Sequence, residues 1–487
     1  MAMVVSSGPL SPSPLALPHR GGLVVAGDRS GVGKTTVTLA ILAALGQRSQ
    51  RVQSFKVGPD YIDPMFHQRV TGRPCYNLDP VLTSPAYLQE CFSRHCEGAE
   101  FVLVEGVMGL FDGASGLSEV ASSAQVAKLL NLPVVLVVDC GRLARSVLAI
   151  IHGFRHFDAD LRLAGVVLNR VASDRHREIL GQALGAIDLP ILGMLPRQTE
   201  ITIPDRHLGL VPAAELPGLA TLVDQLADFG RHHLDWAQLE PLLRRRPGPN
   251  LPSPAPPPSP AQPPPVRIAL AQDAAFSFYY ADALEFMTHL GVDWVPWSPL
   301  RDETLPEAID GLYLGGGFPE MFAPTLAANL PLHRHLRRRI GAGLPTYAEC
   351  GGLMYLAQSL GDLSGQDWPM VGILPTQVGM GYPLTVGYRQ ASGLHPASLV
   401  PPGCSVWGHE FHHSQASPPP AQPLYALRRY DADHSHGQEG WQVGSVQASY
   451  LHLHWGGCPG VAQGFIDRCR RHRQRQDWDS DSSGEDW

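Results

Sequence analysis

The sequence lacks any run of about 18 consecutive apolar residues, the length that a membrane-spanning helix requires, so we expect no membrane association. The first twenty residues also lack the unbroken apolar stretch of a signal peptide, because proline and serine interrupt them. No two of the eight cysteines form a CxxC pair, which favours a reducing cytoplasm over a disulfide framework. An excess of positive charge is missing too: the net charge of −8 gives no indication of nucleic-acid binding.

Proline, in contrast, is concentrated in one stretch. Eleven of the nineteen residues from 247 to 265 are proline, and such a segment forms an extended spacer that joins neither helix nor sheet. The chain of 487 residues is long enough for two or three domains. We therefore predict a flexible arm (1–20), a first domain (21–246), a linker (247–265), a second domain (266–470) and a charge-rich, disordered tail (471–487).

The first half alternates apolar runs with helical stretches, which predicts a doubly wound parallel α/β sheet. The expected strands are 23–27, 51–57, 101–105, 133–139 and 163–169. Between the first strand and a helix at 37–45 lies a loop close to a Walker A motif, although Asp28 stands at its usual first glycine. Gly31 and Gly33 would turn backbone amides toward phosphates, Lys34 would reach the β- and γ-phosphates, and Thr35 would bind Mg²⁺. This loop predicts ATP binding.

Acidic residues follow the next two strands. Asp60 and Asp63 bracket a turn after strand 51–57, at the sheet edge where open α/β folds bind ligands. They indicate a metal or substrate site, with a simple Asx turn as the alternative. Glu105 ends strand 101–105, where a Walker B-type Mg²⁺ ligand is expected, and Asp112 follows in a glycine-rich loop.

The second half restarts the alternation, with strands expected at 266–271, 292–295, 312–314 and 345–348 and helices at 279–290 and 323–340. Cys350 follows the last strand directly and precedes a glycine pair and an apolar helical run, the setting of an exposed nucleophile. We expect the helix N-terminus to lower the pKa of its thiol, and a buried structural cysteine is the alternative. The downstream histidines His452 and His454 are candidate bases, because Cys and His meet in space rather than in sequence.

Residues 409–413 contain a His-Glu-x-x-His pattern, which would bind zinc only on a helix. Gly408 precedes it and prolines follow it from Pro418, so we predict a strand there and no zinc site.

Taken together, these motifs resemble the cobyrinate a,c-diamide synthase family. The resemblance extends from about residue 22 to 465 and rests on segments 30–36, 55–64, 105–113, 273–280, 314–320, 348–356 and 408–412. It implies a dethiobiotin-synthetase-like ATP domain followed by a flavodoxin-like class I glutamine amidotransferase domain. The implied reaction is ATP- and glutamine-dependent amidation of a corrinoid substrate, with Mg²⁺, through acyl phosphates.

The resemblance also implies individual roles. It assigns phosphate and Mg²⁺ contacts to Thr35, Lys56 and Glu105. The loop residues Gly31, Gly33, Lys34 and Thr36 are further candidate nucleotide contacts. It places Asp60, Tyr61, Asp63 and Asp112 near the substrate carboxylate or the metal, Cys350 as nucleophile, and the loop 315–317 as oxyanion donor.

One departure affects the base. The usual His-Pro-Glu ending of class I amidotransferases is replaced by His452-Leu453-His454, so the orienting carboxylate is missing. We predict a Cys350–His452 dyad, with His454 as the other candidate. The alternative functions are another macrocycle amidase, such as cobyrate synthase or a nickel-sirohydrochlorin diamide synthase, and a P-loop ATPase fused to an inactive amidotransferase-like module.

Overall fold

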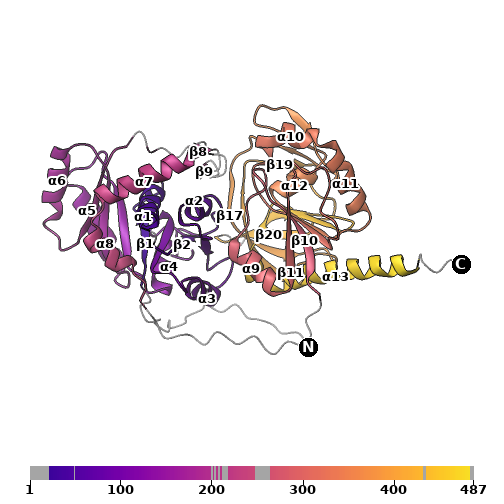
Figure 1. Cartoon of the computed structure of the whole chain (residues 1–487), viewed down its shortest axis with the longest axis horizontal. Coiled ribbons are helices and arrows are strands. Elements are labelled where there is room, and N and C mark those ends of the chain that lie inside the picture. Colours follow the sequence, from indigo (N-terminus) through magenta and orange to yellow (C-terminus); the bar gives the residue numbers. More distant parts are fainter. Residues whose placement is uncertain are drawn as a thin grey trace.

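The structure, a computed structural model, describes residues 21–48, 50–198, 201, 205–206, 209–210, 216, 218–246, 264–431 and 435–482. The predicted arm and residues 247–263 of the predicted linker lie outside these ranges. The described chain forms two α/β halves that lie side by side (Figure 1). Within the described ranges, no helix is both long and apolar enough to cross a membrane.

The first half is built on a seven-stranded sheet of order β3-β2-β4-β1-β5-β6-β7, in which every neighbouring pair is parallel. The sheet confirms the predicted doubly wound architecture. Its strands are β1 (Leu23–Gly27), β2 (Val52–Val57), β3 (Tyr76–Leu78), β4 (Phe101–Gly109), β5 (Val134–Asp139), β6 (Leu163–Val171) and β7 (Ile191–Pro196).

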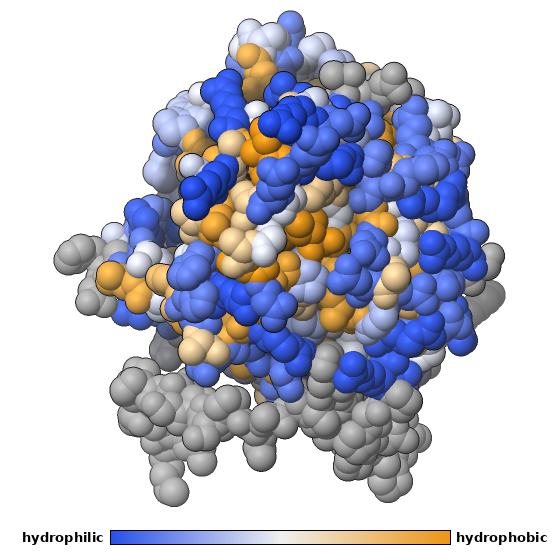
Figure 2. All heavy atoms as spheres, turned by 90° about the vertical axis from the view of Figure 1, so that its left-hand side faces the viewer, coloured by the Kyte–Doolittle hydropathy of each residue, from blue (hydrophilic) through white to orange (hydrophobic). Residues whose placement is uncertain are grey.

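Both faces of this sheet are covered, because successive side chains on a strand point to opposite sides. Leu23 and Val25 of β1 belong to one core, shared with the first helix, while Val24 and Ala26 belong to a second core on the other face. The helices are α1 (Lys34–Gln47), α2 (Ile62–Thr71), α3 (Pro85–His95), α4 (Ser123–Leu129), α5 (Val147–Phe157), α6 (Asp174–Leu184), α7 (Leu219–His233) and α8 (Trp236–Leu243). A short pair, β8 (Asp205–Arg206) and β9 (Gly209–Leu210), precedes α7. Seen from the side of α5 and α6, this half presents mainly hydrophilic residues around a central group of apolar ones (Figure 2).

The second half contains a six-stranded sheet of order β11-β10-β12-β13-β23-β22, parallel except at the β22 edge. The strands are β10 (Val266–Ala271), β11 (Val292–Trp297), β12 (Gly311–Leu314), β13 (Thr346–Glu349), β22 (Trp441–Val443) and β23 (Val446–Ser449). The helices are α9 (Ala281–His289), α10 (Ala323–Ala328), α11 (Leu330–Gly341), α12 (Gly351–Leu356) and α13 (Pro459–Ser482), with 3₁₀ turns η2 (Pro319–Phe322) and η3 (Trp455–Gly457).

Two further sheets flank this core. One has the order β21-β20-β17-β18-β24 and is antiparallel throughout; the other has the order β15-β14-β16-β19. Their bounds are β14 (Ser359–Gly361), β15 (Asp367–Pro369), β16 (Gln377–Gly379), β17 (Thr385–Gly393), β18 (Ser405–His412), β19 (Gln415–Ser417), β20 (Tyr425–Arg429), β21 (Ser435–Glu439) and β24 (His452–Leu453). The His-Glu-x-x-His pattern begins in β18, which confirms the predicted strand.

Two predicted elements differ from the structure. The helix expected at 323–340 is broken at Asn329, whose side chain leaves the helical path to donate to the carbonyls of Pro299 and Asp302 and to cap α11. The predicted disordered tail is wrong for residues 471–482, which continue α13. Apolar residues at helical spacing, Phe465, Ile466 and Cys469, bury the first part of α13. Arg473 then anchors it to the carbonyl of Pro265.

Candidate functional site

The phosphate loop joins β1 to α1 in a conformation that requires glycine. Gly31 and Gly33 have φ angles of 76° and 95°, and Gly33 directly precedes the helix. A Cβ on Gly33 would lie 2.3 Å from the side-chain Nδ2 of Asn169, which donates to the carbonyl of Val32 at 2.8 Å. The loop therefore presents the N-terminus of a 14-residue helix, the arrangement that binds phosphate in P-loop proteins. Lys34 is buried at the loop, and its ammonium donates to the carbonyl of Arg29 at 3.3 Å.

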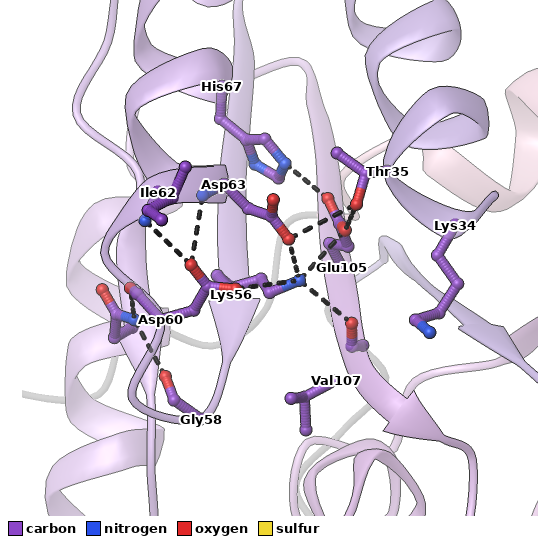
Figure 3. Close-up of polar contacts among 12 residues, drawn as sticks. Lys34, Thr35, Lys56, Gly58, Asp60, Ile62, Asp63, His67, Glu105 and Val107 are labelled. Atoms are coloured by element: carbon purple, nitrogen blue, oxygen red, sulfur yellow. Dashed lines mark hydrogen bonds and ion pairs between the residues drawn. The ribbon is translucent and has the colours of Figure 1, made fainter. Parts of the chain in front are cut away.

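Beside the loop, four predicted residues from four elements meet in one polar cluster (Figure 3). The Thr35 hydroxyl of α1 donates to Glu105 Oε1 of β4 at 2.7 Å and lies 3.3 Å from Asp63 Oδ2 of α2. The Lys56 ammonium of β2 lies 2.5 Å from Asp63 Oδ2 and 3.0 Å from Glu105 Oε1. These elements meet because β2, β4 and β1 are neighbours in the sheet.

The charges in the cluster depend on one another. Burial opposes the ionisation of Glu105, but the Lys56 ammonium and a hydrogen bond from His67 outweigh it and hold its pKa well below the usual range. Burial and the nearby charge of Asp60 raise the pKa of Asp63 to about 8. Burial and the charge of Lys56 lower the pKa of Lys34. A fixed negative charge at Glu105 therefore lies within a set of hard oxygen donors, the ligand type that Mg²⁺ prefers.

Sequence reasoning missed two members of this cluster. His67 Nε2 lies 2.7 Å from Glu105 Oε2, and its Nδ1 lies 3.3 Å from the sulfur of Cys75. Burial disfavours the charged imidazole, but Cys75 and Glu105 raise the pKa of His67 to about 10. The spacing of His67, four residues after Asp63 and on the same helix face, is the signal that would have pointed to it.

The other predicted acids have local partners. Asp60 Oδ1 accepts from the amides of Ile62 at 2.8 Å and Asp63 at 3.1 Å, while its Oδ2 lies 3.6 Å from the Lys56 ammonium. It thus forms the Asx turn given above as the alternative and also faces the cluster. Asp112 is exposed and accepts from the amide of Gly109 at 2.9 Å, so it shapes the loop after β4.

In the second half, Cys350 occupies a strained turn between β13 and α12. It follows β13 with φ 45° and ψ −99°, and its amide donates to the carbonyl of Ser449 at 2.8 Å. The following glycines are needed for close packing: a Cβ on Gly351 would lie 3.0 Å from the Gly317 nitrogen, and one on Gly352 would lie 2.3 Å from the Leu314 oxygen. The expectations of an exposed nucleophile and of a lowered thiol pKa are both wrong. Cys350 is only 4% exposed, and burial followed by the charge of Glu320 raises the pKa of the thiol.

The two candidate bases occupy different surroundings. A Cβ on Gly316 would lie 2.4 Å from the Cε1 of His452, so this imidazole packs on the same glycine loop as the Cys350 turn. Burial, with the nearby His412, lowers the pKa of His452 to about 3, which keeps the ring neutral. His454 instead faces α9, with its Nε2 3.1 Å from Asp282 Oδ2.

In the expected oxyanion loop 315–317, one amide already has a partner, because the Gly315 amide donates to the Tyr279 hydroxyl at 2.9 Å.

A second group that sequence reasoning missed lies on β17 and β18. There the buried Arg389 and Glu410 form an ion pair at 2.6 Å, and the charge of Glu410 contributes to raising the thiol pKa of Cys350.

A cavity of about 640 Å³ lies between the two halves. Its first-half lining includes Ser30 and Gly31 of the phosphate loop, and its second-half lining includes His409, which pairs with His452 in register. Tyr61, also in the lining, stacks on Phe278 with ring centroids 5.0 Å apart. The cavity therefore has walls from both halves: residues of the predicted phosphate and metal site on one side, and Phe278 with residues of β17 and β18 on the other.

Comparisons with known proteins also distinguish two parts of the chain. Residues 23–211 match the family model of the CobQ/CobB/MinD/ParA nucleotide binding domain, and residues 267–459 match that of the CobB/CobQ-like glutamine amidotransferase domain. The chain is thus an amidotransferase-type ligase with one domain of each kind.

Full-length relatives narrow the class. The chain is 54% identical to a cobyrinate a,c-diamide synthase of Synechocystis sp. over 92% of this chain and 93% of the relative. It is 42% identical to a hydrogenobyrinate a,c-diamide synthase of Streptomyces coelicolor over 92% of this chain and 97% of the relative. The chain belongs to the cobyrinate a,c-diamide synthase family.

Proposed function

We propose that this protein uses ATP and glutamine to convert the a- and c-carboxylates of cobyrinate, or of its metal-free counterpart, into amides. The observation that carries the proposal is the cavity shared by the phosphate loop and the strand paired with His452, because a substrate there would contact both domains. The names of the relatives support the choice of substrate.

The first half-reaction activates the carboxylate. A carboxylate does not react with ammonia at neutral pH. One carboxylate oxygen therefore attacks the γ-phosphorus of ATP; ADP departs, and an acyl phosphate is formed. Lys34 and the loop amides stabilise charge on the transferring phosphoryl group. The oxygen donors Thr35 and Glu105 fit Mg²⁺, which would supply further charge neutralisation when bound.

The second half-reaction produces ammonia. The Cys350 sulfur attacks the side-chain carbonyl of glutamine while His452 takes the thiol proton and passes it to the departing ammonia. Water then hydrolyses the thioester to glutamate and regenerates Cys350. Ammonia attacks the acyl phosphate, so phosphate leaves and the amide forms.

The packing of His452 and the buried thiol of Cys350 support this assignment. A buried thiol requires a base to remove its proton, and the His452 imidazole packs on Gly316, in the glycine loop that also contacts the Cys350 turn. His454 is a weaker candidate, because Asp282 already occupies its Nε2 side.

The macrocycle would lie in the cavity against its apolar rim. Met108 and Val386 line the cavity from opposite halves and are 41% and 49% exposed. Large exposed apolar side chains around a cleft are typical of ligand-binding sites.

The test is incubation of the protein with ATP, glutamine, Mg²⁺ and one of three macrocycles: cobyrinate, hydrogenobyrinate or nickel-sirohydrochlorin. Mass spectrometry should show two successive acid-to-amide conversions with one of the first two. Conversion of the nickel macrocycle alone, or ATP hydrolysis without any amide product, would contradict the proposal.

A further inference from the structure

We propose that Glu349, the residue immediately before the nucleophile, is the carboxylate that positions His452 during glutamine hydrolysis. This inference rests on the proposed function, because it assigns a role within the glutaminase half-reaction. Class I amidotransferases have a glutamate two residues after the base, where this chain has His454. No residue next to His452 in the sequence offers a carboxylate. The fold provides one from a different strand.

Glu349 is the last residue of β13 and is only 1% exposed. Its carboxylate accepts three hydrogen bonds: from the Tyr313 hydroxyl at 2.9 Å, the Tyr347 hydroxyl at 2.9 Å and the Leu453 amide at 3.0 Å. The two phenols come from neighbouring strands of the sheet, at paired positions. A buried carboxylate with three donors has a fixed orientation, because any rotation would break at least one of these bonds.

That orientation is directed at the base. Glu349 Oε2 lies 3.8 Å from His452 Nδ1, and Nδ1 makes no hydrogen bond to any residue that the structure describes. The Leu453 amide belongs to the residue next to His452, so the same carboxylate holds the backbone beside the base. The separation exceeds a hydrogen bond, yet hydrogen bonds of catalytic groups are often long in unliganded enzymes and shorten when the substrate binds.

The chemical consequence concerns which nitrogen carries the proton. A carboxylate facing Nδ1 favours the tautomer with its proton on Nδ1, which leaves the Nε2 lone pair to accept the thiol proton of Cys350. Once the imidazole is protonated, its positive charge lies next to Glu349 and is stabilised by it. The proton then leaves from Nε2 with ammonia, and the imidazole returns to its starting form.

Other ionisable groups also face this pair. Tyr61, His409, His412 and Glu410 surround His452. The hydroxyls of Tyr313 and Tyr347 donate to Glu349, and His454 also lies near it. Of the carboxylates in this set, Glu410 is paired with Arg389. Glu349 is therefore the carboxylate available to the Nδ1 side of the base.

The decisive variant is Glu349→Gln, which keeps the volume and still offers an oxygen to the Leu453 amide. We expect kcat for glutamine hydrolysis to fall by about 100- to 10,000-fold; the upper end is the loss seen when the orienting carboxylate of a Ser-His-Asp triad is neutralised. The KM for glutamine and the rate of synthesis from external ammonium should stay close to those of the wild type. Alkylation of Cys350 by iodoacetamide at pH 8 should slow, because without the Glu349 carboxylate the His452 imidazole accepts the thiol proton less readily.

Glu439→Gln is the matched control. Glu439 is another glutamate of the second half, and it accepts from the Tyr450 amide at 3.0 Å rather than facing the base. This variant should keep glutamine-dependent kcat within a few-fold of the wild type. If Glu349→Gln behaves like the control, Glu349 only anchors the Leu453 backbone and the inference is wrong.

If Glu349→Gln loses synthesis with both glutamine and ammonium, the variant has misfolded. Glu349→Asp then distinguishes a positioning role from a purely structural one. The shorter carboxylate should reduce glutamine-dependent kcat while ammonium-dependent synthesis persists; an equal loss with both sources would overturn the inference. The proposed function is tested separately, because it fails only if the wild-type protein does not amidate the macrocycle from glutamine.

Discussion

The ring of Tyr61, from the nucleotide-binding half, lies 5.3 Å from the imidazole of His452, in the amidotransferase half. Tyr61 also contacts Phe278 and Tyr280, and it precedes Asp63 of the polar cluster by two residues. One short segment therefore contacts both candidate active sites. We interpret the Tyr61 ring as part of the barrier between the two proposed sites, one of which would release ammonia and the other consume it.

Replacing this ring should uncouple the two reactions. In Tyr61→Ala, glutamine hydrolysis should continue while the yield of amide per glutamate formed drops severalfold, because ammonia escapes to solvent. Tyr61→Phe keeps the stacked ring and should retain the wild-type ratio. Parallel assays of glutamate and amide product measure this ratio, and an unchanged ratio in Tyr61→Ala would exclude Tyr61 from the barrier.

The proposed division of the reaction between the halves predicts opposite responses of two variants to added ammonium. Cys350→Ala should abolish synthesis from glutamine, because only that half-reaction needs the thiol, and high external ammonium should restore it. Lys34→Ala should lose synthesis with either nitrogen source, because no acyl phosphate forms. Product analysis with both sources distinguishes the variants. If Cys350→Ala uses glutamine at the wild-type rate, the nucleophile assignment is wrong.

Variants of His452 and His454 should give different results in the same assay. His452→Ala should reproduce the Cys350→Ala phenotype, whereas His454→Ala should retain glutaminase activity. Because His454 contacts Asp282 and also the Tyr87 ring of the first half, its loss should instead weaken the contact between the halves and lower the melting temperature. If His454→Ala loses glutaminase activity and His452→Ala retains it, the base is His454 and not His452.

In the first half, Glu105→Gln removes the charge beside Thr35 and Lys56. We expect amide synthesis to fall by at least about 100-fold, since metal-assisted phosphoryl transfer depends on that charge. Glutamine hydrolysis at Cys350 should persist. Synthesis close to the wild-type rate would show that Glu105 does not act in the site.

Much of this arrangement could be predicted because local patterns encode it. The glycine loop before Lys34 and the strand–cysteine–glycine order around Cys350 each define a turn whose geometry follows from nearby residues. Contacts between distant strands are different: His67 reaches Glu105 only after α2 packs beside β4, and Glu349 reaches His452 only after β24 joins β18. The thiol pKa of Cys350 was wrongly expected to be low because a helix end is visible in sequence, whereas the burial that dominates is not.

Burial of Glu349 leads to a prediction about stability. Burial raises its pKa from 4.5 to about 7, although the Leu453 amide and two tyrosine hydroxyls oppose the shift. Between these values the folded protein retains a proton that the unfolded chain has released. The contribution of Glu349 to the free energy of unfolding is therefore full below pH 4.5 and decreases as the pH rises to 7, by up to about 1.4 kcal/mol per pH unit.

Thermal unfolding of the wild type and Glu349→Gln isolates this contribution, because the other groups titrate alike in both proteins. The melting temperature of the wild type, minus that of the variant, should be several degrees higher at pH 5 than at pH 7.5. A difference that stays constant or grows with pH would mean that Glu349 is already ionised at pH 5, so that its three hydrogen-bond donors outweigh burial.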